Sequence, residues 1–270
     1  MRAERYAYFD EPFAAYAHRG GALYPPNRHR ENTRYAFQQA VDLGYRYLET
    51  DVHATADGFL VAFHDSVLDR VTDRTGAIAQ LPYAEVARAR IAGQDPIPLL
   101  SELLTAFPGA RFNIDAKSDG AVDLLAAAIA EHDAYDRVCI SSFSVARLHR
   151  LRRRLGSRVA SAASSAGVAV NRFVPWLTWA LNSPAPVLQM PASYPFRARR
   201  LQVLTPRLVK AVHQAGKRVQ IWTVDDSETM TRLIDLGVDG IFTDRIDVLK
   251  DVLVRHGLWT GPTGPREAQS

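Results

Sequence analysis

The feature that most limits the fold of this chain is a regular alternation of short apolar segments with segments of helical pattern. Eight apolar segments are predicted to be strands: residues 13–21, 45–52, 111–117, 138–143, 158–162, 186–190, 218–224 and 240–244. Two parallel strands need a crossover connection, usually a helix, so the alternation predicts an α/β fold with a parallel sheet. Eight such units favour a closed TIM (β/α)8 barrel, and an open doubly wound sheet is the alternative.

The length and composition of the chain fit this architecture. A barrel of this kind takes about 250 residues as one domain, and the chain has 270 residues, of which 47% are hydrophobic. We therefore expect a single domain over residues 1–270, with its core over about 13–256 and a flexible tail over 257–270. Residues 66–96, which polar residues and prolines interrupt, are expected to form a short insertion after the second strand.

Charge and cysteine content argue against several classes of protein. The formal charge of +4 is mild and no nucleic-acid-binding motif accompanies it, so we expect the arginines at 147–154 to form a solvated helix face. Cys139 is the only cysteine and lies in an apolar strand, so it is expected to be buried. No run approaches the roughly 18 apolar residues of a spanning helix, and no secretory signal begins the sequence, so the expected location is cytoplasmic.

The second predicted strand carries the densest group of candidate functional residues. Its alternation places Glu49 and Asp51 on the same side, where both carboxylates can bind one hard cation. Only residues 54–59 separate it from the next apolar run, which is too short for a crossover helix, so we expect a β-hairpin turning at 56–58. The return strand places His64 beside the two carboxylates, where it could act as an acid or a base.

Polar and aromatic residues also gather where the other predicted strands end. Barrel enzymes build their sites from the C-terminal ends of the strands, so these positions are stronger candidates than polar residues elsewhere. The ends carry His18, Arg19, Asp115, Lys117, Ser142, Phe143, Gln189, Trp222, Thr223, Thr243 and Asp244. Asp244 is expected to cap the last helix, and Trp222 either borders the site or packs as a strand aromatic.

Several of these residues lie in motifs that follow one another in a fixed order. The motifs are His18-Arg-Gly, Glu31-Asn-Thr, Glu49-x-Asp51, His64-Asp65, Leu68-Asp-Arg-x-Thr72, Asp115-Ala-Lys117, Ser141-Ser-Phe, Trp222-Thr-Val and the segment 237–244. Together they strongly resemble the glycerophosphodiester phosphodiesterase family over roughly residues 13–253.

This resemblance implies metal-dependent hydrolysis of a glycerophosphodiester to sn-glycerol 3-phosphate and an alcohol, on a TIM barrel. It implies three groups of site residues: the metal ligands Glu49, Asp51 and Asp115, the general acid/base pair His18 and His64, and the substrate-binding residues Arg19, Lys117 and Trp222. The chemistry is consistent, because a cation and cationic side chains neutralise the charge that builds on phosphoryl oxygens, and histidines transfer protons near neutral pH. Oxygen ligands favour Mg2+ or Ca2+ over zinc.

Two positions leave alternatives open. Asp115 stands where the family commonly has Glu, which is one methylene longer. Either the strand sits closer, a water bridges the gap, the affinity for the ion falls, or Asp115 pairs with Lys117 instead. His53 follows Glu49 and Asp51 in alternation, and it either faces the site or lies outside it.

The segment 172–181 is rich in apolar and aromatic residues, including Trp176 and Trp179. It is either a core helix or a hydrophobic lip that touches acyl chains or a membrane surface, which would widen the substrate range to lysophospholipids. The alternative functions are therefore an enzyme resembling lysophospholipase D or phospholipase C, and a catalytically silent barrel that binds phosphodiesters. A silent barrel normally lacks an acid or a histidine of the site, and this sequence has them all.

Overall fold

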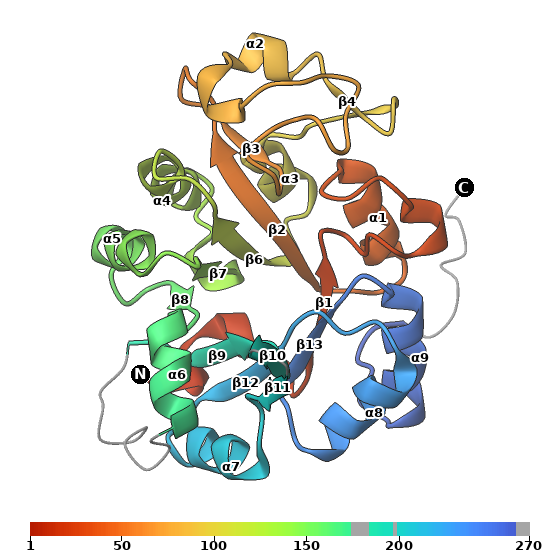
Figure 1. The fold of residues 1–270 in the computed structure, drawn as a ribbon, viewed down its shortest axis with the longest axis vertical. Coiled ribbons are helices and arrows are strands. Elements are labelled where there is room, and N and C mark those ends of the chain that lie inside the picture. The colour runs from red at the N-terminus through yellow and green to blue at the C-terminus, as the bar shows by residue number, and fades with distance from the viewer. Residues whose placement is uncertain (174–183, 197–198, 263–270) are drawn as a thin grey trace.

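The central element of the molecule is a ring of parallel strands. The computed structural model describes residues 1–173, 184–196 and 199–262. Within these residues eight parallel strands form the ring (Figure 1): β1 (Ala14–His18), β2 (Tyr47–Ala54), β6 (Arg111–Ala116), β7 (Val138–Ser141), β8 (Ala160–Ser161), β9 (Val187–Met190), β12 (Arg218–Ile221) and β13 (Gly240–Thr243). Most barrel strands that follow one another in the sequence pair directly, and β13 pairs with β1. A parallel bridge from Ala162 to Val187 joins β8 to β9. The predicted TIM barrel is confirmed.

Helices surround the strands, as Figure 1 shows. They are α1 (Arg34–Asp42), α3 (Leu100–Ala106), α4 (Ala121–Glu131), α5 (Val145–Leu155), α6 (Ser165–Phe173), α7 (Pro206–Gln214), α8 (Ser227–Asp235) and α9 (Ile246–Arg255). The side chain of Thr33 caps α1, and α5 buries Leu148 and Leu151 while Arg153 and Arg154 are exposed. The predicted solvated face therefore holds for Arg153 and Arg154 but not for the whole run, because Arg147 and Arg152 are partly buried and donate to the carbonyls of Ala116 and Ala162 at 2.9 and 2.7 Å. No helix in the described part of the chain is long and apolar enough to cross a bilayer.

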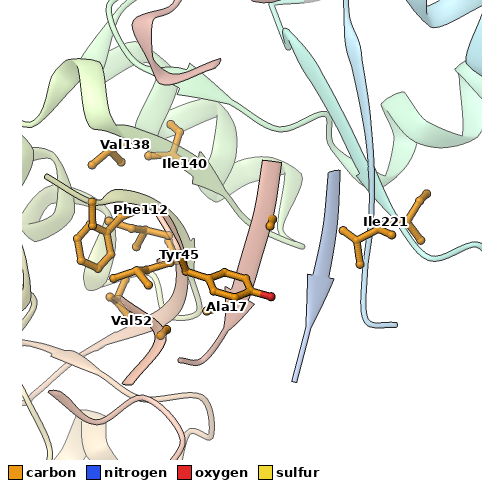
Figure 2. Close-up of a cluster of buried hydrophobic side chains, with 14 of the residues drawn as sticks. Ala17, Tyr45, Val52, Phe112, Val138, Ile140 and Ile221 are labelled. Carbon is orange, nitrogen blue, oxygen red and sulfur yellow. The ribbon is translucent and has the colours of Figure 1, made fainter. Parts of the chain in front are cut away.

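The larger hydrophobic core lies between the strands and the helices. Figure 2 shows part of it, including Phe112 of β6 and Val138 and Ile140 of β7. These three side chains are at most 1% exposed. Side chains alternate along a strand, so the residues between them face the inside of the barrel.

A smaller, aromatic cluster fills the interior of the barrel. Tyr16 of β1 and Phe242 of β13 stack with their ring centroids 4.0 Å apart. The hydroxyl of Tyr47 on β2 donates a hydrogen bond of 2.8 Å to the carbonyl of Tyr8. Cys139 is fully buried in the same cluster, as predicted. This cluster forms an aromatic plug, and the interior stays open at the C-terminal ends of the strands.

The packed structure extends beyond the predicted core boundaries. Tyr8, upstream of residue 13, is 1% exposed beneath the barrel. Downstream of residue 256, Trp259 packs edge-on against Tyr45, with ring centroids 5.1 Å apart. Both termini of the described chain thus contribute apolar contacts that the sequence pattern did not indicate.

The chain after β2 turns back at once. Strand β3 (Leu60–Ala62) pairs antiparallel with the end of β2, and Gly58 has a φ of 86° in the turn between them. The segment that follows contains η4 (Ile78–Gln80), α2 (Tyr83–Val86) and the short strands β4 (Arg90–Ile91) and β5 (Asp95–Pro96). It has its own small apolar cluster, and in Figure 1 it lies beyond the end of β2.

A second hairpin, of β10 (Ser193–Phe196) and β11 (Arg199–Gln202), was not predicted. Strand β10 carries a proline, which weakens a strand signal. Of the apolar segment 172–181, only Arg172 and Phe173 at the end of α6 are described. Trp176 and Trp179 lie outside the described residues.

From the packing of the core we predict how truncation of a buried side chain changes the free energy of unfolding. Replacement of Ile140 by alanine leaves a cavity between β7 and its helices, and it should lower the free energy of unfolding by about 2–5 kcal/mol. The matched control is Val254→Ala, because Val254 is 44% exposed on α9, and it should change the value by less than about 0.5 kcal/mol. Urea unfolding followed by circular dichroism measures both. Equal losses would contradict the assigned packing.

Candidate active site

A cavity of about 470 Å³ opens at the C-terminal ends of the barrel strands. All eight residues predicted for the site line it: His18, Arg19, Glu49, Asp51, His64, Asp115, Lys117 and Trp222. The position at the strand ends is the one at which barrel enzymes carry their active sites.

The register of the sheet explains why these residues meet. His18 of β1 lies beside Glu49 of β2, and Asp51 lies beside Asp115 of β6. Parallel strands with a two-residue period direct every second side chain inward, so these neighbours form rows inside the barrel. The backbone thus fixes the positions of one histidine and three acids.

The tight turn after β1 directs Arg19 into the same region. Arg19 has a left-handed φ of 50°, and its backbone N–H donates to Oε2 of Glu49 at 3.1 Å. Its Nε lies 3.3 Å from Oδ2 of Asp51. Gly20 follows with a φ of 86°, and a Cβ there would lie 2.8 Å from Cβ of Ala36. The glycine of the His-Arg-Gly motif is therefore required for the close approach of this turn to α1.

Lys117 connects two of the buried acids. Its Nζ lies 2.9 Å from Oδ1 of Asp51 and 2.8 Å from Oδ2 of Asp115. Burial opposes the charge of Lys117, but the two carboxylates outweigh it and raise its pKa. Burial likewise opposes the charge of Asp51, but Lys117 and Arg19 hold its pKa below the ordinary value. The pairing of Asp115 with Lys117, one of the alternatives left open by the sequence, is present.

The other two acids are less well neutralised. Burial, reinforced by the charge of Asp51, raises the pKa of Glu49 to about 7. Burial also raises the pKa of Asp115, despite its contact with Lys117. The site therefore holds more carboxylate groups than its own cations neutralise.

The predicted metal ligands are close in space but are not arranged as a finished metal centre. Among the described residues, no group of three or more His, Cys, Asp or Glu side chains is positioned to hold an ion. Lys117 takes up the position between Asp51 and Asp115. However, Oδ1 of Asp115 is buried without a hydrogen-bond partner, and the donor set consists of oxygen atoms. The chemistry of these residues fits a hard divalent cation.

His18 is held by an aspartate from the far end of the chain. Its Nδ1 lies 2.8 Å from Oδ1 of Asp244, and its Nε2 lies 3.8 Å from Oε2 of Glu49. Because a carboxylate accepts hydrogen bonds, Nδ1 carries a proton, and Nε2 is the ring nitrogen that can accept or release a proton in a reaction. Burial disfavours the imidazolium, but Glu49 and Asp244 outweigh it and raise the pKa of His18. The predicted helix-capping role of Asp244 is wrong, because Arg245 occupies the N-cap of α9.

His64 has an equivalent arrangement built from local residues. Its Nδ1 lies 2.6 Å from Oδ1 of Asp65, so the aspartate of the His-Asp motif orients the ring. Hydrogen bonds from Arg70 and from His64 hold the pKa of Asp65 at about 2. His53 donates from Nε2 to the carbonyl of His64 at 3.1 Å. It supports the backbone of His64 instead of lining the cavity.

One side of the cavity is apolar. Trp222 contacts Phe143 edge-on, with ring centroids 5.7 Å apart. Further lining residues come from α6, from the end of β9 and from the chain that follows it: Val168, Ala169, Phe173, Met190, Pro191 and Val203. The sequence analysis named Phe143, Trp222 and, in the possible lip at 172–181, Phe173. It missed Val168 and Ala169, because a residue on the inner face of a helix looks the same whether it faces a core or a cavity.

The geometry defines a class of protein: a barrel enzyme whose cavity combines buried acids, cations and two aspartate-backed histidines. Comparison with known families agrees, since the model of the "Glycerophosphoryl diester phosphodiesterase family" matches residues 18–248. The chain belongs to this family, as the motifs indicated.

Individual relatives cover nearly the whole chain. The "Probable glycerophosphodiester phosphodiesterase 2" of Mycobacterium tuberculosis is 39% identical over 92% of this chain and 93% of its own length. A glycerophosphodiester phosphodiesterase from Agrobacterium tumefaciens has a similar structure, with a TM-score of 0.73, 24% identity and coverage of 88% and 99% of the two chains. An Oleispira antarctica phosphodiesterase, solved with the product sn-glycerol-3-phosphate, has a TM-score of 0.73, 24% identity and coverage of 92% and 99%.

The contact between His18 and Asp244 predicts that loss of the aspartate charge lowers the turnover rate. Asp244→Asn keeps the shape of the side chain but removes the charge that orients the ring of His18 and stabilises its protonated form. It should lower kcat by about tenfold or more. The matched control is Asp239→Asn, because Asp239 lies at the opposite end of β13 and pairs with His213 at 2.8 Å. Steady-state hydrolysis of glycerophosphocholine compares the two, and equal kcat values would refute the assigned role.

Proposed function

We propose that the protein is a metal-dependent hydrolase that cleaves glycerophosphodiesters to sn-glycerol 3-phosphate and an alcohol. The main support is that His18 and His64, each held at Nδ1 by an aspartate, line one cavity with Arg19 and Lys117. Family membership supports the reaction class, and the product bound by the Oleispira phosphodiesterase supports the choice of product.

The two histidines would form the general acid/base pair. One Nε2 takes the proton from the attacking water as the new phosphorus–oxygen bond forms. The other Nε2 gives a proton to the leaving alkoxide as the old phosphorus–oxygen bond breaks, so the alcohol departs neutral. The aspartates behind the rings hold the tautomers that leave both Nε2 atoms available.

Arg19 and Lys117 would bind the phosphate. Both are cationic side chains at the cavity surface, and a phosphodiester carries a negative charge that repels a nucleophile. The planar fork of Arg19 suits two phosphate oxygens, while Lys117 acts as a point charge. Trp222 would border the glycerol, next to these cations.

Glu49, Asp51 and Asp115 would hold the divalent cation, Mg2+ or Ca2+, by their oxygen atoms. When bound, this ion neutralises charge on the phosphoryl oxygens. The carboxylates already exceed the nearby cations in number, and Oδ1 of Asp115 has no hydrogen-bond partner. Lys117 competes with a cation for Asp51 and Asp115, and the substrate phosphate offers it another anion.

A second candidate substrate is a lysophospholipid. The apolar wall of the cavity favours it, because burial of an acyl chain against such a surface is stabilising. Phe143 and Phe173 at this wall are 59% and 64% exposed, so they could meet an acyl chain or the surface of a membrane.

The acid/base assignment predicts large losses of activity. With glycerophosphocholine, His18→Ala and His64→Ala should each lower kcat at least about 100-fold. His149→Ala, an exposed histidine on α5, is the control and should retain full activity. A chelator should abolish wild-type turnover, and Mg2+ or Ca2+ should restore it. Full activity in His18→Ala would overturn the assignment, and substrate binding without wild-type turnover would indicate the silent barrel.

The apolar wall predicts a change in substrate preference. Phe173→Ser should lower the ratio of kcat/KM for long-chain lysophosphatidylcholine to that for glycerophosphocholine by about fivefold, because an apolar contact is lost. Val254→Ser, an exposed apolar position on α9, is the control. An unchanged ratio in Phe173→Ser would exclude this wall as the acyl site.

A further inference from the structure

Arg70 makes an unusual double contact in the segment that follows β3. Its Nε and Nη2 donate to the two carboxylate oxygens of Asp65 at 2.6 and 3.1 Å. Its Nη1 and Nη2 donate to the two oxygens of Glu31 at 3.0 and 2.7 Å. One guanidinium therefore binds two carboxylates, each through two hydrogen bonds.

Each of these carboxylates holds a residue of the cavity. Asp65 contacts Nδ1 of His64 at 2.6 Å. Glu31 accepts from Nη1 of Arg19 at 3.3 Å. His64 follows β3 and Arg19 follows β1, so Arg70 connects the ends of two different strands. Arg70 itself is not among the described residues that line the cavity.

The arrangement is more constrained than an ordinary surface ion pair. The side chains of Glu31 and Asp65 are only 13% and 21% exposed, although that of Arg70 is 46% exposed. Without Arg70 the two carboxylates would face each other without a cation between them, since both lie within 3.1 Å of the same nitrogen atom. A lysine could not replace the contact, because it lacks the planar fork that matches two carboxylates.

We propose that Arg70 is a positioning residue of the hydrolytic reaction, fixing the ring of His64 through Asp65 and the guanidinium of Arg19 through Glu31. The inference rests on the proposed function, in which His64 transfers a proton and Arg19 binds the phosphate. Its consequence is that the segment after β3 aligns the proton-transfer group with the phosphate-binding group. Removal of Arg70 then affects both kcat and KM.

The first test compares Arg70→Met with Arg74→Met, using glycerophosphocholine as the substrate. Arg74 is exposed in the same segment, and its side chain makes no ion pair within the described residues. Arg70→Met should lower kcat about tenfold and raise KM several-fold, while Arg74→Met should match the wild type. Arg70→Lys should recover only part of the loss. Wild-type values in Arg70→Met would overturn the proposal.

A second test separates positioning from a general effect on folding. In a His64→Ala background, assayed at enzyme concentrations that give measurable residual turnover, Arg70→Met should change kcat less than twofold, since the residue that it orients is gone. An equal tenfold loss in both backgrounds would show a merely structural role. Thermal melting of each variant accompanies the kinetics.

The two arms of the contact can be tested separately. Asp65→Asn should reproduce the loss of kcat, and Glu31→Gln should reproduce the rise of KM. The opposite pattern would contradict the assignment. Failure of this inference is distinguishable from failure of the proposed function, because the latter would appear as absent wild-type turnover or as full activity in His64→Ala.

Discussion

The constraint on which the site depends is an excess of buried negative charge at one end of the barrel. The inward positions of β2 run from Tyr47, in the aromatic plug, to Glu49 and Asp51 at the cavity. Burying carboxylates is unfavourable unless cations or hydrogen bonds compensate them. Lys117 and Arg19 compensate Asp51, whereas the pKa of Glu49 rises to about 7 because burial and its neighbour outweigh the available cations. This imbalance favours the binding of a cation at the cavity.

The barrel and most of the lining residues could be predicted from the sequence because the signals are local. A two-residue period fixes which side chains of a strand share a face, and a short gap after β2 excludes a crossover helix. Glu49 and Asp51 are thus placed on one side by their spacing alone. Their meeting with His18 and Asp115 follows from the parallel order of the strands, which the eightfold alternation already implies. The pattern alone indicated a cation site at Glu49 and Asp51, whereas the expected roles of the other residues came from the family resemblance.

The contact that orients His18 and the contact between Arg70 and Glu31 could not be predicted, because they depend on which residues meet in space. Asp244 is 226 positions from His18, and its place before α9 resembles that of an ordinary cap. Arg70 lies in a segment of irregular pattern, where nothing in the sequence shows that it meets Glu31. Val168 and Ala169 of α6, which line the cavity, were missed for a different reason, since they have the pattern of an ordinary core helix.

The cavity has a polar part and an apolar part, which come from different elements of the barrel. Most of its polar part comes from β1, β2 and β6, whose mutual hydrogen bonds fix the backbone, and His64 follows β3. A shift of one acid would therefore disturb several strands. Its apolar part comes from α6 and the residues after β9, which make few contacts with those three strands. Substitutions in the apolar part can change the shape offered to the leaving alcohol while the histidines and acids stay in place. In the proposed function, this division would separate the proton and phosphate chemistry from the choice of alcohol, so one polar part would serve both small and acyl-bearing diesters.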